Sequence, residues 1–142
     1  MSVSLRTVAA QDSEFAYQVK KTTLAEYVWQ LWGWDEAEQR RLHQRRFASQ
    51  NFQVIVADVG ILVVSKEPDC LRVNQLLVLP EYQGKGVGTA CMRQVLDDAA
   101  GRRLPVRLKV LKVNRRASGF YWRLGFVDTG LDDTHVQMER PV

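Results

Sequence analysis

Apolar residues recur along the chain with helical spacing in some stretches and with alternation in others. Four such residues predict a first long helix that ends near Gly33: Leu24, Tyr27, Val28 and Leu31. Asp35, with Glu38 three residues later, resembles a capping box and predicts a second helix that runs to about Ala48. The start of the chain therefore contributes two consecutive helices after a short opening strand.

Two further helices are expected in the second half of the chain. The third has an apolar face and should end at Gly101: Cys91, Met92, Val95, Leu96 and Ala99. The fourth is capped by Asn114 and should stop at Gly125, with one face formed by Ala117, Phe120, Tyr121 and Leu124. Alternating or β-branched runs predict strands over residues 3–8, 52–57, 61–65, 71–79, 106–110, 126–131 and 134–139. Helices thus intersperse a mixed sheet, which indicates the α/β or α+β class.

Length and charge narrow the class of protein. With 142 residues, 46% of them hydrophobic, residues 1–142 should form a single domain. The sequence has no long apolar run and no signal-peptide pattern, so we expect a cytoplasmic protein without a membrane partner. The net charge of +4 suits an anionic ligand but is too scattered to indicate nucleic acid. The late arginines of the second helix are interpreted as a solvated face: Arg40, Arg41, Arg45 and Arg46.

Two cysteines are too few for a disulfide framework. Cys70 and Cys91 show no metal-ligand spacing, so we expect two buried thiols and no metal.

The glycine-rich segment 83–89 lies between an apolar run that ends at Leu79 and Pro80 and the start of the third helix. Glycine lets main-chain N–H groups approach a ligand, and a helix start adds unpaired donors and partial positive charge. A phosphate group is the expected ligand. A P-loop is excluded because Gly86 follows Lys85, and a dinucleotide fingerprint is excluded because Thr89 replaces its third glycine.

The segment does match the pattern Gln-x-x-Gly-x-Gly, filled by Gln83, Gly86 and Gly88. Val78-Leu79-Pro80 precedes it, Asn114 is followed by Ala117 and by Phe120-Tyr121, and the helix leaves through Leu124-Gly125-Phe126. In these motifs the chain resembles the GNAT superfamily of acyl-CoA-dependent N-acyltransferases. The resemblance implies a central mixed, mostly antiparallel sheet of six to seven strands with about four helices. It also implies acetyl-CoA as co-substrate and no metal.

Roles follow from the resemblance for the matching residues. The strand end that should contact the pantetheine arm is Leu77, Val78 and Leu79. The turn that should hold the pyrophosphate is Gln83, Gly84, Lys85, Gly86, Val87, Gly88 and Thr89. The late helix should add Asn114, Ala117, Phe120 and Tyr121 to the acetyl-CoA site. The main-chain N–H of Val78 is expected near the thioester oxygen, and Tyr121 is expected to act as general acid toward the CoA thiolate.

The proton acceptor stays open at this point, because Asn74 and Gln75 on the central strand cannot act as bases. The alternatives are a water relay, Glu26, Glu36, His135 and, less favoured, His43. An acceptor amine could be held by cation–π contacts and charge from Trp29, Trp32, Trp34, Glu36 and His135.

These residues predict an enzyme that transfers acetyl from acetyl-CoA directly to a primary amine of a small molecule. Two alternatives are an acyl-CoA-binding sensor without turnover and a protein N-terminal acetyltransferase. Many proteins of this family are dimers, and whether this one forms a homodimer is left open.

Overall fold

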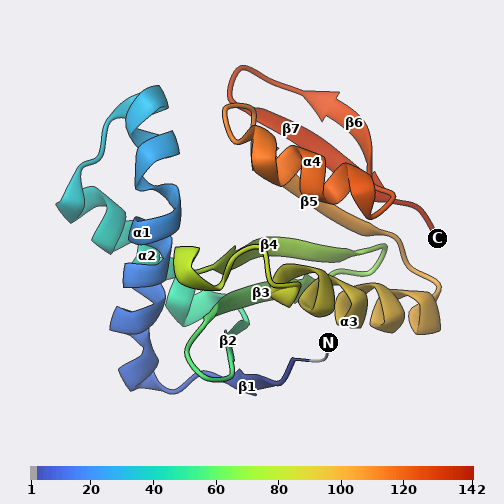
Figure 1. The fold of residues 1–142 in the computed structure, drawn as a ribbon, viewed down its shortest axis with the longest axis horizontal. Coiled ribbons are helices and arrows are strands. Elements are labelled where there is room, and N and C mark those ends of the chain that lie inside the picture. The colour runs from blue at the N-terminus through green and yellow to red at the C-terminus, as the bar shows by residue number, and fades with distance from the viewer. Residues whose placement is uncertain (1–2) are drawn as a thin grey trace.

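The computed structural model describes residues 3–142, in which β4 (Leu71–Val78) is the middle strand of a seven-stranded sheet (Figure 1). The elements follow in the order β1 (Leu5–Thr7), α1 (Ser13–Trp32), α2 (Glu36–Ser49), β2 (Phe52–Ile55), β3 (Gly60–Lys66), β4, α3 (Val87–Arg102), β5 (Val106–Leu111), α4 (Arg115–Arg123), β6 (Val127–Leu131) and β7 (His135–Arg140). This order and the mixed α/β class confirm the predictions from sequence.

The sheet changes direction beside β4. Its strand order is β1-β2-β3-β4-β5-β7-β6, and β4 and β5 are the parallel neighbours among otherwise antiparallel pairs. These two strands pair only at Leu71 with Val106 and at Arg72 with Arg107, and then they separate. A bulge leaves Asn74 without a partner on β3, because Val73 pairs with Val64 and Gln75 with Val63. Bulges bend a strand, which fits the divergence of β4 from β5.

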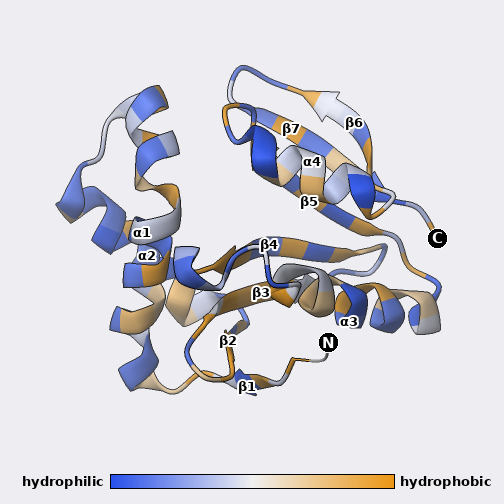
Figure 2. Cartoon of the chain, in the orientation of Figure 1, coloured by the Kyte–Doolittle hydropathy of each residue, from blue (hydrophilic) through white to orange (hydrophobic). Residues whose placement is uncertain are grey.

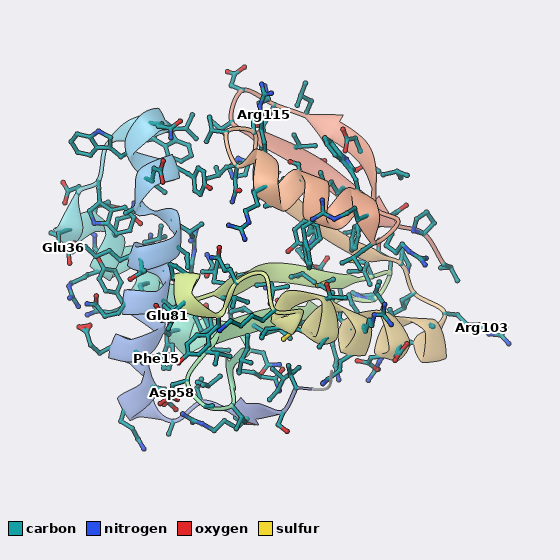
Figure 3. All side chains as sticks on the ribbon, in the orientation of Figure 1. Phe15, Glu36, Asp58, Glu81, Arg103 and Arg115 are labelled. Carbon is teal, nitrogen blue, oxygen red and sulfur yellow. The ribbon has the colours of Figure 1, made fainter. Side chains whose placement is uncertain are left out.

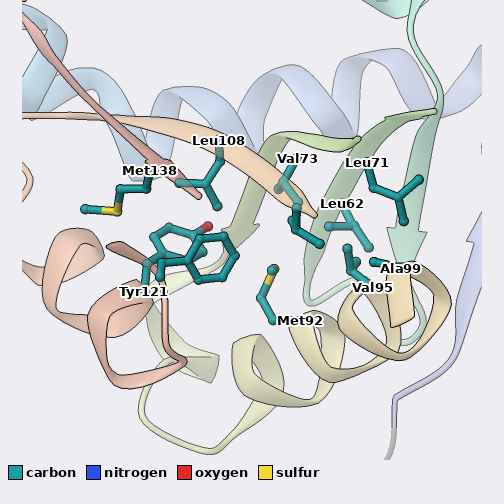
Figure 4. Packing of buried hydrophobic residues seen from close by; sticks show 11 residues of the cluster. Leu62, Leu71, Val73, Met92, Val95, Ala99, Leu108, Tyr121 and Met138 are labelled. Carbon is teal, nitrogen blue, oxygen red and sulfur yellow. The ribbon is translucent and has the colours of Figure 1, made fainter. Parts of the chain in front are cut away.

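Helices cover both faces of the sheet. On one face, α1 packs against β2 and β3 through Ala16, Val19, Phe52 and Ile61. On the other, residues from α3 and α4 meet the sheet in the larger core, shown in Figure 4: Met92, Val95, Tyr121, Leu71, Leu108 and Met138. Figure 2 shows the corresponding pattern, with a largely hydrophilic α2 and hydrophobic inner strands. The core thus contains side chains from both ends of the chain.

Two local predictions can be judged directly. Gly33 ends α1 with φ +76°, and Asp35 caps α2 by accepting from the Glu38 N–H, as predicted. The prediction that Gly101 ends α3 is wrong, because the helix continues to Arg102 and Arg103 adopts the left-handed conformation. Both cysteines are buried free thiols. Within residues 3–142, no helix is both long enough and apolar enough to cross a membrane.

Candidate active site

A cleft of about 1230 Å³ opens where β4 and β5 separate. Leu24, Val28 and Trp32 line it from α1, while Asn114, Ala117 and Tyr121 line it from α4. Residues 72–77 of β4 and 107–111 of β5 form its inner walls, and β7 closes one side. Because α1 and α4 pack on opposite faces of the sheet, the cleft is lined from both faces.

Beside this cleft, the end of β4 has an edge that pairs with no strand of residues 3–142. Leu79 donates its N–H to the Val59 carbonyl at 2.9 Å, on the β3 side. N–H groups of successive strand residues point to opposite edges, so the N–H of Val78 points toward the edge from which β5 has separated. A donor at this place is free to bind a ligand carbonyl.

The glycine turn follows β4 and leads into α3. Gly84 and Gly86 have φ values of +75° and +84°, a left-handed conformation that favours glycine. No side chain caps α3, so the first N–H groups of the helix have no side-chain acceptor. Gln83 donates from Nε2 to the Val78 carbonyl at 2.8 Å, which fixes the turn against the strand end. The turn is therefore built to offer several N–H donors to an anion.

Gly88 has a packing role in addition. A Cβ at this position would lie 3.3 Å from Cζ of Phe120, so the missing side chain allows α3 and α4 to approach closely. Phe120 packs against the core and does not line the cleft. Its predicted contact with the co-substrate stays a prediction.

Asn114, the residue before α4, and Tyr121 on α4 both line the cleft, and their contacts with the co-substrate stay predictions. Asn114 accepts from the Ala117 N–H at 3.1 Å, which caps the helix, and it also lines the cleft. Tyr121 is 6% exposed and its ring packs against Phe126, with centroids 5.3 Å apart. Burial raises the pKa of Tyr121, so its hydroxyl stays protonated at neutral pH.

His135 lines the cleft from β7, and its ring lies 6.4 Å from that of Trp32 on α1. Burial, with a smaller contribution from Lys109, lowers the pKa of His135 below its usual range. The imidazole is therefore mostly neutral at pH 7 and can accept a proton.

A comparison with protein-family models agrees with the residues found at this site. Residues 9–126 match the model of the acetyltransferase (GNAT) family. The chain belongs to the GNAT family. It is 31% identical over 106 residues to streptothricin acetyltransferase of Streptomyces lavendulae, a match that covers 74% of this chain. The match spans only 56% of that relative's length.

Solved structures show the same GNAT fold. The PaiA N-acetyltransferase of Thermoplasma acidophilum, solved in complex with coenzyme A, has a TM-score of 0.79 and 17% identity over 100% of both chains. Ard1 from Thermoplasma volcanium has a TM-score of 0.71 and 26% identity over 100% of this chain and 99% of its own. Both structures share their arrangement of sheet and helices with this chain.

Several residues predicted for the acceptor side lie outside the cleft. Trp29 is 67% exposed and does not line it. Trp34 donates from Nε1 to Glu36 at 2.9 Å, and Glu36 also pairs with Lys21 and Arg40. Figure 3 shows Glu36 at the outer edge of the helix pair. Of the predicted acceptor residues, only Trp32 and His135 line the cleft.

Among the residues considered as bases, Glu26 lies on the surface and His43 is buried, where its Nε2 lies 2.9 Å from the Ser13 carbonyl. Four basic side chains also line the cleft, although the sequence does not predict them there: Arg46, Arg72, Arg107 and Lys109. They come from three separate elements, α2, β4 and β5, so no local pattern indicates them.

Proposed function

We propose that this protein transfers acetyl from acetyl-CoA directly to the primary amine of a small molecule. The observation that supports this most is the free β4 edge at Val78, which adjoins a glycine turn with free donors and a cleft that contains Tyr121. The turn fits the pyrophosphate of the co-substrate, and the strand edge fits the amide groups of its pantetheine arm. When bound, acetyl-CoA supplies an activated thioester.

The Val78 N–H is assigned to the thioester oxygen. A main-chain donor held in a strand needs no reorganisation as negative charge grows on that oxygen. Gln83 supports this geometry by binding the carbonyl of the same residue. The assignment depends on the backbone, so it does not require a particular side chain at position 78.

Tyr121 is assigned the role of general acid. Its raised pKa keeps the proton on the phenol at neutral pH, so the Tyr121 hydroxyl can donate to the sulfur of the departing thiolate as negative charge develops there. The Tyr121→Phe variant keeps the ring contacts with Phe120 and Phe126 and removes only the hydroxyl group. The fold should therefore survive this change.

His135 is assigned as proton acceptor for the attacking amine. It is the candidate base from the sequence that lines the cleft, and its lowered pKa leaves it neutral at pH 7. The cationic residues of the cleft assist, because nearby positive charge lowers the pKa of an amine and increases the neutral fraction that can attack.

The first experiment measures CoA release after primary amines or short peptides are added to the protein with acetyl-CoA. We expect release that depends on a small amine. Binding of acetyl-CoA without release would favour the sensor, and release with peptides alone would favour the protein N-terminal acetyltransferase.

Two variants then test the assigned roles by their pH profiles. Tyr121→Phe should lower kcat by about 100-fold across the profile without changing Tm, whereas Tyr27→Phe, outside the cleft, should change neither. His135→Gln should lower kcat/KM at neutral pH and recover at higher pH, where the amine loses its proton to solvent. An unchanged rate for Tyr121→Phe at all pH values would contradict the acid assignment.

A further inference from the structure

The side chains that line the cleft carry an excess of positive charge. Arg46, Arg72, Arg107 and Lys109 line it, and Glu139 is the one carboxylate among the lining residues of the described chain. A cleft with this charge is a poor site for an acceptor with several positive charges. It favours an acceptor that brings negative charge with its amine.

Two of these cations are already neutralised. Arg72 pairs with Glu67 at 2.7 Å. Arg107 pairs with Glu139 at 2.8 Å and with Asp69 at 3.0 Å. Both ion-pair networks form between residues of this chain. No carboxylate of residues 3–142 that lines the cleft is therefore free to bind an amine.

Arg46 is different, because no carboxylate of residues 3–142 pairs with it. It projects from the last turn of α2, on the face of the sheet opposite to α3. The glycine turn lies at the start of α3, so an anion at Arg46 is distinct from the phosphates expected at that turn. Lys109, also unpaired in the described chain, lies close enough to His135 to lower its pKa.

Lys20 is another cation that pairs with no carboxylate of residues 3–142. Lys20 of α1 is only 7% exposed, and its Nζ lies 4.8 Å from the centre of the Phe52 ring. It precedes Leu24, which lines the cleft, by about one helical turn. The positive charge of Arg46 is close enough to lower the pKa of Lys20. Arg46, which is exposed to solvent and lines the cleft, and the buried Lys20 therefore add positive charge on the α1 and α2 side of the cleft.

We infer, building on the proposed function, that the acceptor is an amine that also carries a carboxylate, and that Arg46 binds this carboxylate. The positive charge of Lys20 adds to the attraction. The guanidinium group is planar and presents paired donors that match a carboxylate. His135, the proposed proton acceptor, lines the same cleft as Arg46, so an acceptor held at Arg46 by its carboxylate can extend its amine toward His135. The carboxylate thus orients the amine toward the thioester.

The experiment compares matched acceptors. Straight-chain amino acids from glycine to 6-aminohexanoate are each tested against their carboxamide and against the corresponding aminophosphonate. The best carboxylate should have a kcat/KM about 10- to 100-fold above its carboxamide. Arg46→Gln should remove this preference, and Arg45→Gln, an exposed neighbour on α2 outside the cleft, should keep it.

Equal rates for carboxylate and carboxamide would overturn the inference, as would a preference that survives in Arg46→Gln. Higher rates with the phosphonate would overturn the assignment to a carboxylate.

A calorimetric titration of the same compounds into the CoA-bound protein separates this inference from the proposed function. If no amine releases CoA, the proposed function fails. Carboxylate binding that Arg46→Gln removes still supports the Arg46 site, and equal binding of carboxamide rejects it.

Discussion

Lys20 holds a positive charge in a place where it lowers the stability of the fold. Burial and the nearby Arg46 lower its pKa from 10.5 to about 8, and its aromatic contact with Phe52 offsets only part of the lost hydration. Between pH 8 and 10.5 the unfolded chain therefore binds a proton that the native chain does not. The native state should gain stability as the pH rises through this range.

We therefore predict that Lys20→Met stabilises the protein at pH 7. The pKa difference corresponds to at most about 3 kcal/mol of unfolding free energy. Urea unfolding of both proteins from pH 7 to 10.5 measures it, and the difference between them should shrink as the pH rises. Burial raises the pKa of Cys91 to about 11, so this thiol also makes stability depend on pH. Cys91 is the same in both proteins, so its effect cancels in the difference between them. Lys21→Met, at a lysine paired with Glu36, is the control and should not stabilise the protein. A less stable Lys20→Met at pH 7 would contradict the prediction.

Residues whose place depends on their neighbours in sequence could be predicted. Asn114 caps the helix that it precedes, and the Tyr121 ring lies on the predicted buried face. Glu36 could not be placed, because its partner Lys21 comes from another helix. Arg46 is exposed, as the prediction of a solvated helix face requires, and only the fold shows that it also lines the cleft without an acidic partner among residues 3–142.

At the level of elements, the position of the β4 end depends on Gly60 in β3. A Cβ at Gly60 would lie 2.1 Å from the Leu77 carbonyl oxygen, which is backbone and cannot turn aside. Gly60→Ala should therefore push β4 away from β3, next to Val78. We expect the unfolding free energy to fall by about 1–3 kcal/mol or more, and kcat to fall with it.

Gly101→Ala is the matched control for this change. Gly101 lies inside α3, and a Cβ there meets nothing within 4 Å. Because alanine favours a helix interior over glycine, this variant should gain about 0.5–1 kcal/mol. Thermal unfolding of the two variants beside the wild type distinguishes them. A stable Gly60→Ala with normal kcat would show that the strand end tolerates displacement.

The order of strands and helices could be predicted from the period of the apolar residues, and the glycine turn from its motif. The error at Gly101 has a physical reason. A glycine ends a helix when a left-handed residue is needed there, but here Arg103 adopts that conformation two residues later. The separation of β4 from β5 could not be read from the sequence, since register between distant strands leaves no local pattern there.

The two halves of the sheet are joined weakly through their strands, because β4 and β5 pair at only two positions, and the larger core joins the parts on either side. A ligand that reaches from the glycine turn into the cleft should therefore add contacts to both sides and stabilise them together. We predict that CoA raises Tm more than an equal concentration of adenosine 3′,5′-bisphosphate, which has a nucleotide but no pantetheine arm. Hydrogen exchange should show CoA protecting β5 and α4, with the bisphosphate protecting only the start of α3. Equal Tm shifts would mean that the arm does not enter the space between β4 and β5.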